Sequence, residues 1–267
     1  MQPLSKRQPE MKKALKNVIA ALLVAAPMSM AVASSGGHYE HAEIDPRDQV
    51  SLQRGAQIFV NNCLSCHSAA AMRYNRLQDI GLSEDEIKKN LMFTTDKVGD
   101  VMQAHMSPAD SKKWFGKTPP DLTLIARSRG ADYIYAYLRG FYKDPTTPTG
   151  WNNTMLPKAA MPHVLWEQEG VKVAKLDKDG KMVLKADGTP DWTWESTGKL
   201  TRMTKDGKVI TKEFDTYAKD LTNFMAYMAE PAQVQRKQIG YIVLMFLLAV
   251  MLPLAYFLKK EYWKDVH

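Results

Sequence analysis

Two cysteines and a histidine stand together in a pattern that could do chemistry. Cys63, Cys66 and His67 form the spacing Cys-x-x-Cys-His, and the 267-residue chain contains no cysteine besides these two. Cysteines at this spacing could anchor a c-type haem, form a redox dithiol, supply half of a zinc site, or close a short disulfide. The function of the chain depends on which of these four kinds of site the residues form.

Covalent haem attachment is the interpretation that the pattern favours. Two thiols about one helical turn apart can reach the two vinyl groups on one edge of a porphyrin, and the following His67 can bind the iron. A zinc site would need two more ligands, and the chain offers no second cysteine pair or suitable histidine pair. A thioredoxin-like dithiol needs a βαβ context, and a disulfide across two residues would be strained. We therefore expect one haem c, bound covalently to Cys63 and Cys66, with His67 as an axial iron ligand.

A second axial ligand to the iron has to come from elsewhere in the chain. A methionine or histidine there would make an electron carrier, whereas an open position would make a haem enzyme such as a peroxidase, or a gas binder. Among 16 methionines, Met161 is the leading candidate because Pro162 follows it in an irregular segment and can stiffen the loop. Met155, Met106 and His163 are the competing ligands.

Apolar residues at helical spacing predict three helices around the motif. These helices are expected over residues 51–62, 131–141 and 215–229. A further helix is predicted to begin after Ser83, because Glu86 follows three residues later as in a capping box. The first of the helices ends directly before Cys63, so it should position the motif.

The helix over residues 51–62 is expected to cross the helix over residues 215–229. Gly55 lies within the first helix and costs it stability, which predicts a close contact with another helix at that point. The contact should bring Gly55 and Phe59 against an aromatic residue of the second helix, Phe224 or Tyr227.

Three stretches carry loop or turn signals instead of helical ones. Pro119 and Pro120 predict a loop that ends in a helix cap at Asp121, and residues 144–162 predict a long ordered loop. Residues 168–212 predict small hairpins or an irregular surface insertion. The turn signals within them are Asp179-Gly180, Asp187-Gly188 and Asp206-Gly207.

The N-terminal residues 1–33 predict a secretory signal peptide. Lys12 and Lys13 form a positive region, residues 18–26 a short apolar region, and residues 31–33 a small-x-small cleavage site. Met11 could be the true start, because a complete positive region follows it. Export would place residues 34–235 outside the cytoplasm, where haem is attached to bacterial c-type cytochromes.

A single membrane anchor is predicted near the C-terminus, over residues 236–258. Residues 239–258 form an uncharged apolar run long enough to cross the hydrocarbon core of a bilayer. Pro253 should kink this helix slightly. Given export of the preceding domain, residues 259–267 would be a cytoplasmic tail.

Charge excludes nucleic-acid binding as a function. The formal net charge is +7, but the excess lies in the two terminal segments, and residues 34–235 carry 26 cations and 26 acids. A neutral exported domain gives no electrostatic support for binding a phosphate backbone.

An ordered series of short motifs resembles the cytochrome c1 family, the haem subunits of cytochrome bc1 complexes. The resemblance runs from about residue 40 to the end, and includes the Cys63–His67 motif and a C-terminal anchor. The other motifs are Arg54-Gly55-x-x-x-Phe59, Met72-Arg73-Tyr74, Pro119-Pro120-Asp121-Leu122, Ile125-Ala126-Arg127-x-Arg129, Asp132-Tyr133, Ala160-Met161-Pro162, Ala229-Glu230-Pro231 and Arg236-Lys237-x-x-Gly240.

The resemblance implies a mostly α, class I cytochrome c fold and one-electron transfer. Electrons would arrive from a Rieske iron–sulfur protein beside cytochrome b in the bacterial inner membrane, and leave to a soluble c-type cytochrome on the periplasmic side. It implies that Met161 is the distal iron ligand, that Arg129 meets a haem propionate, and that Tyr133 lies beside it. Residues 168–212 depart from the compact family pattern. Two alternatives remain: a haem c subunit of another membrane oxidase or dehydrogenase, and a haem enzyme such as a peroxidase with an open iron position.

Overall fold

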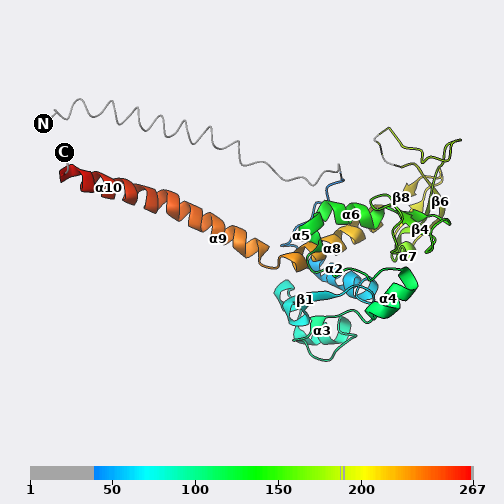
Figure 1. Cartoon of the computed structure of the whole chain (residues 1–267), viewed down its shortest axis with the longest axis horizontal. Helices are drawn as coiled ribbons and strands as arrows, with labels where there is room; N and C mark the ends of the chain where they lie inside the picture. The colour runs from blue at the N-terminus through cyan, green and yellow to red at the C-terminus, as the bar shows by residue number, and fades with distance from the viewer. Residues whose placement is uncertain (1–38, 187, 189, 266–267) are drawn as a thin grey trace. The chain divides into compact units, whose positions relative to one another are not determined.

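Helices make up most of the regular structure in the computed structural model, which describes residues 39–186, 188 and 190–265 (Figure 1). The expected signal peptide over residues 1–33 lies outside these described residues.

Two long helices, α2 (Gln49–Asn62) and α8 (Lys212–Ala229), pack against each other. Helix α2 leads directly into the Cys63–His67 motif. Their contact is the predicted one: the rings of Phe59 and Phe224 lie 5.7 Å apart, and Gly55 lies against the backbone of α8. The carboxylate of Asp220 on α8 accepts a hydrogen bond of 2.7 Å from the Ser51 hydroxyl, so polar contacts reinforce the apolar ones. The prediction that these helices cross at Gly55 and Phe59 is confirmed.

Substitution of Gly55 tests how close this crossing is. A Cβ atom at position 55 would overlap the carbonyl oxygen of Asp220 and lie 2.6 Å from the Cβ of Phe224. Gly55→Ala is therefore expected to destabilise the folded state by about 1–3 kcal/mol, because overpacking outweighs the roughly 0.5–1 kcal/mol gained from higher helix propensity. Thermal unfolding of the purified protein measures the change. Gly99→Ala, where an added Cβ meets nothing within 4 Å, is the control and should leave stability within ~0.5 kcal/mol.

Shorter helices surround this pair. They are η3 (Tyr74–Ile80), α3 (Glu84–Asn90), α4 (Pro108–Phe115), α5 (Ile125–Arg129), α6 (Ala131–Arg139) and α7 (Trp166–Glu169). The capping box predicted at Ser83 and Glu86 begins α3, and this prediction is confirmed.

Two predicted helix boundaries were wrong. Helix α6 ends at Arg139, before Gly140, so Phe141 begins a strand instead of completing the helix. Asp121 does not cap a helix either: its carboxylate accepts hydrogen bonds from the backbone N–H groups of Ala70 and Thr123, and α5 begins later, at Ile125. The carboxylate therefore ties the loop before α5 to the segment that follows the cysteine motif.

Short strands form three small sheets. Strands β1 (Ala69–Arg73) and β2 (Val101–Met102) pair antiparallel, as do β7 (Arg202–Met203) and β8 (Val209–Ile210). The third sheet has the order β4-β3-β5-β6, in which β3 and β5 pair parallel and the outer pairs are antiparallel. Its strands are β3 (Phe141–Lys143), β4 (Trp151–Asn153), β5 (Gly170–Ala174) and β6 (Trp192–Thr197).

Residues 168–212 contain the β structure that their turn signals predict. Strands β5 to β8 lie within this range, and Asp206-Gly207 falls in the turn between β7 and β8. The segment is also joined to the rest of the domain, because β5 pairs with β3. The expected loop over residues 144–162 includes one short strand, β4.

The C-terminal segment is one long apolar helix, drawn in orange to red in Figure 1. It spans Gln233–Tyr262, 30 residues, with a mean hydropathy of 2.5 over its most apolar window and no residue of that window buried. Helix α9 (Gln233–Phe246) leads through a π turn, η4 (Leu247–Met251), into α10 (Leu252–Tyr262) and a last 3₁₀ turn, η5 (Trp263–Asp265).

Pro253 explains the π turn. Proline has no backbone N–H and its ring clashes with the carbonyl four residues earlier, so the regular helical hydrogen bonds cannot continue through it. The wider π turn directly before α10 accommodates the interruption while the helix continues. By its length and composition this helix could cross a membrane.

Candidate haem site

The Cys63–His67 motif lies in a tight turn that extends α2. Cys63 caps the C-terminus of the helix, and its backbone N–H donates to the carbonyl of Phe59 at 2.8 Å. The backbone N–H groups of Cys66 and His67 both donate to the carbonyl of Cys63, at 3.1 and 2.8 Å. The two thiols are therefore held about one helical turn apart, and neither forms a disulfide.

All six residues that the sequence singled out line one pocket. The pocket has a volume of about 390 Å³ and a largely apolar lining, which are typical of cofactor sites. Its walls come from the end of α2, the 115–122 loop, α5 and α6, and the 156–164 loop. The six residues are Cys63, Cys66, His67, Arg129, Tyr133 and Met161.

His67 has the orientation and charge state of a metal ligand. Its Nδ1 lies 2.8 Å from the carbonyl oxygen of Pro120. A carbonyl oxygen can only accept, so Nδ1 carries the proton and the lone pair remains on Nε2. Burial lowers the pKa of His67, which keeps the imidazole neutral at physiological pH. This hydrogen bond is a contact that the sequence alone did not reveal.

Of the four candidates for the second axial ligand, Met161 lines the pocket and the other three do not. Its Sδ accepts a weak hydrogen bond of 3.7 Å from the hydroxyl of Tyr137. Tyr137 lies within the helix predicted over residues 131–141, but nothing in the sequence indicated this contact. Another methionine, Met225 of α8, is buried and also lines the pocket, although the sequence did not single it out.

Arg129 and Tyr133 lie close together, Arg129 at the C-terminus of α5 and Tyr133 in the first turn of α6. The guanidinium carbon of Arg129 lies 5.7 Å from the ring centroid of Tyr133, within the range of a cation–π contact. Arg129 is exposed and makes no ion pair within the described ranges. A guanidinium that lines a cofactor pocket without a carboxylate partner fits a ligand carboxylate such as a haem propionate.

His163 lies in a separate buried cluster of ionisable groups. Its Nε2 is 2.8 Å from Oε2 of Glu169, an ion-pair distance at which the two atoms are not aligned for a hydrogen bond. The other oxygen of Glu169 lies 2.5 Å from Nζ of Lys172, which also donates to the carbonyl of Arg139. The side chains of His163, Glu169 and Lys172 are at most 5% exposed. The cluster joins the loop that carries Met161 to strand β5.

The residues of the pocket fit a covalently bound haem. They supply two thiols one turn apart, a neutral imidazole with a free Nε2, a thioether and an unpaired guanidinium in an apolar cavity. Among the described residues, no group of three or more His, Cys, Asp or Glu side chains is placed to hold a bare metal ion. This set of pocket side chains fits a haem that is held by two thioether bonds.

Comparison with known proteins agrees with this geometry. The model of the "Cytochrome C1 family" matches residues 39–195 and 200–266. A cytochrome c1 of Allochromatium vinosum is 44% identical, over 94% of this chain and 99% of the relative. A Nitrosomonas europaea protein named "Ammonia monooxygenase gamma subunit" has the same identity and coverage. A Rhodospirillum rubrum cytochrome c1 is 30% identical over 94% of this chain and 99% of the relative. The family match spans the pocket and the apolar helix alike, and the chain belongs to the cytochrome c1 family.

Proposed function

We propose that this protein is the membrane-anchored haem c subunit of a respiratory quinol–cytochrome c reductase and that it transfers single electrons. The observation that carries the proposal is the pocket in which Cys63, Cys66, His67 and Met161 meet, in a chain of the cytochrome c1 family. The haem, when bound, supplies an iron that cycles between ferric and ferrous states. Electrons would arrive from a Rieske iron–sulfur protein beside cytochrome b and leave to a soluble c-type cytochrome.

Each pocket residue has a role in this proposal. Cys63 and Cys66 hold the haem covalently, so it cannot dissociate. His67 would bind the iron through Nε2, with its ring fixed by the hydrogen bond to the Pro120 carbonyl, and Met161 would supply the second ligand. Thioether ligation raises the reduction potential, which suits a carrier that accepts electrons from the quinol side. Arg129 and Tyr133 would meet a propionate at the pocket wall.

The chain needs no catalytic site of its own in this scheme. If His67 and Met161 both bind the iron, no position would remain open for a substrate, as a peroxidase would need. Quinol oxidation would take place in other subunits. The chain contributes to the enzyme as its electron-transfer subunit.

The membrane topology follows from the two ends of the chain. We propose that residues 1–33 are removed after export, that residues 34–235 form the haem domain on the periplasmic side, and that residues 236–258 anchor it in the inner membrane. Residues 259–267 would then remain in the cytoplasm. The exposed apolar helix over Gln233–Tyr262 supports the anchor.

Purification of the tagged chain from its native membrane in mild detergent tests the proposal. The complex should contain a b-type cytochrome and an iron–sulfur protein, and it should reduce a soluble cytochrome with quinol. The main alternative is a haem c subunit of a different membrane oxidase or dehydrogenase. Recovery of the chain with such an enzyme, and without a b-type cytochrome or an iron–sulfur protein, would favour that alternative and reject the proposal.

A further inference from the structure

All charged residues that line the haem pocket are cations. Lys117 comes from the loop after α4, Arg129 from the end of α5, and Lys158 from the loop that leads to Met161. All three are exposed, and they make no ion pair within the part of the chain that the structure describes. The mouth of the pocket is therefore positively charged, although the exported domain as a whole is neutral.

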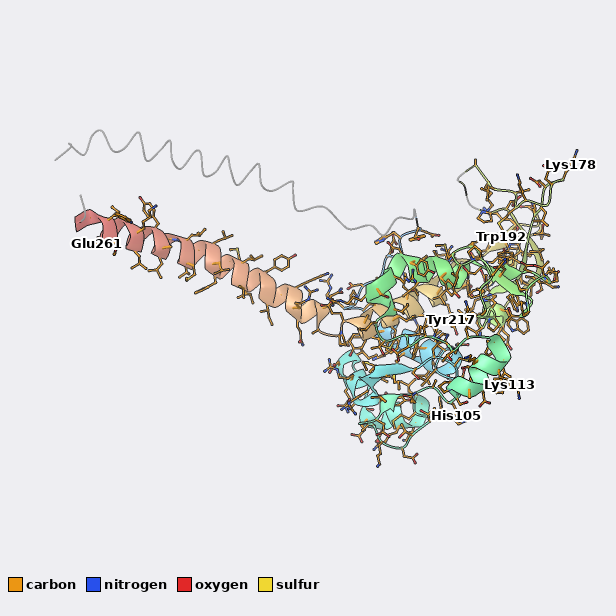
Figure 2. The ribbon with its side chains drawn as sticks, viewed as in Figure 1. His105, Lys113, Lys178, Trp192, Tyr217 and Glu261 are labelled. Atoms are coloured by element: carbon orange, nitrogen blue, oxygen red, sulfur yellow. The ribbon has the colours of Figure 1, made fainter. Side chains whose placement is uncertain are left out.

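Two more lysines extend this charge along α4. Lys112 and Lys113 occupy the last turn of α4, which ends at the lining residue Phe115. Figure 2 shows Lys113 on this helix at the surface of the domain. We name these residues the cationic rim. Its members are Lys112, Lys113, Lys117, Arg129 and Lys158.

Three carboxylates lie within four residues of a rim cation, and each takes part in local contacts. Asp132 accepts a hydrogen bond of 2.9 Å from the backbone N–H of Ala42 and lies 3.1 Å from Nδ1 of His41. At the start of α4, the carboxylate of Asp110 accepts a hydrogen bond from the hydroxyl of Ser107. The backbone N–H of Asp110 donates to the same hydroxyl. Asp121 accepts from the backbone N–H groups of Ala70 and Thr123, at 2.7 and 2.8 Å. These three acids are fewer than the five cations of the rim, and none of the three lines the pocket.

Large apolar side chains are also exposed close in sequence to the cations of the rim. Trp114 is 61% exposed, Leu124 57%, Leu156 50% and Trp166 48%. Leu156 lines the pocket, and the other three are next to or close in sequence to lining residues. Exposed tryptophan and arginine are typical of the residues that anchor protein interfaces, which have a polar, solvent-accessible rim around them.

We propose that the cationic rim is the docking surface for a soluble one-electron carrier protein whose own docking face is acidic. This proposal rests on the proposed function and specifies its electron acceptor. The haem brings two propionates, and Arg129 is placed to meet one of them. Two lysines, Lys117 and Lys158, and no carboxylate line the pocket besides Arg129, so the pocket mouth keeps a positive excess over the one propionate that remains.

Charge complementarity at such a surface acts mainly on the rate of association. Opposite charges steer the encounter over about one Debye length and can raise the association rate by about 10–10³-fold at low ionic strength. The attraction weakens as salt is added. The sign of the salt effect therefore reports the charge around the pocket mouth.

Oxidation of the reduced haem in the purified complex by two small probes measures this sign. Ferricyanide is an anion, and tris(phenanthroline)cobalt(III) is a cation. The rim predicts that ferricyanide reacts faster at low ionic strength and slows as salt is added, whereas the cobalt complex speeds up. The opposite pair of salt effects would overturn the proposal.

Charge-reversal variants locate the effect on the rim. Lys117→Glu/Lys158→Glu is expected to lower the low-salt rate with ferricyanide about tenfold. Lys112→Glu/Lys113→Glu, on the exposed surface of α4, is the second variant if the first pair disturbs folding. Lys178→Glu/Lys205→Glu changes the net charge equally on exposed turns, and Figure 2 shows Lys178 far from Lys113. If the rim variants behave like this control, the proposal is wrong.

A binding measurement separates this proposal from the proposed function. The full-length chain is immobilised in detergent, and an acidic and a basic c-type cytochrome of similar size are passed over it. The acidic probe should bind more tightly, with a Kd that rises with salt and about tenfold in the rim variants. Tighter binding of the basic probe would overturn the docking surface even if the haem and the complex are as proposed. Slower reduction of the haem by quinol in the rim variants, with unchanged oxidation, would assign the surface to the electron donor and reject the proposal.

Discussion

Met161→Leu is expected to abolish the weak red-edge absorption band that marks thioether ligation of ferric haem. Leucine fills nearly the same volume but has no lone pair to bind iron. The reduction potential should fall by on the order of 0.1 V, within the ~0.8 V range that axial ligands set. Visible spectroscopy and a redox titration of the purified chain measure both changes.

Two other methionines serve as matched controls. Met225 lines the pocket from α8, and Met155 does not line it. Met225→Leu and Met155→Leu should both keep the band, and Met225→Leu should cost less than about 1.5 kcal/mol because the side-chain volume is conserved. If Met225→Leu loses the band and Met161→Leu keeps it, the axial ligand is Met225 of α8 and not Met161.

Glu169→Ala is expected to destabilise the folded protein by about 3–5 kcal/mol. The substitution would leave the ammonium of Lys172 buried without its carboxylate, and removal of one partner of a buried ion pair typically costs this much. His163 would lose its ion-pair contact with this carboxylate at the same time. Chemical denaturation, followed by circular dichroism, gives the change in the free energy of unfolding.

An exposed pair on the same sheet provides the control. Lys143 and Glu195 form an ion pair in which both side chains are 46% exposed, so Glu195→Ala should cost only about 0–1 kcal/mol. Glu169→Ala/Lys172→Met removes both buried charges and should recover much of the lost stability. A cost below about 1 kcal/mol for Glu169→Ala alone would contradict the account of the cluster.

The parts of the fold that the sequence predicted depend on local patterns. The spacing of Cys63, Cys66 and His67 is short, and the crossing of α2 and α8 was indicated by a glycine in an otherwise regular apolar stripe. The capping box at Ser83 is also local. In each case the chemistry of a few neighbouring residues determines the structure.

The missed contacts join residues that lie far apart in the chain. Nothing near Pro120 shows that its carbonyl accepts from His67, which precedes it by 53 residues. Glu169 and Lys172 lie in a segment of turns and charges that predicts a solvated surface, yet pairing of β5 with β3 buries them. Helix α6 was predicted too long because the apolar pattern continues to Phe141, while the backbone changes to a strand after Gly140.

The most direct test of the account is whether haem stays on the chain after denaturation. The full-length protein, expressed with the export and haem-attachment machinery, should stain for haem on a denaturing gel and give a pyridine haemochrome spectrum of one c-type haem per chain. Cys63→Ser/Cys66→Ser should lose both signals. Haem that is extracted from the wild-type chain by acid and acetone, or a wild-type band without haem stain, would contradict the covalent site at Cys63 and Cys66.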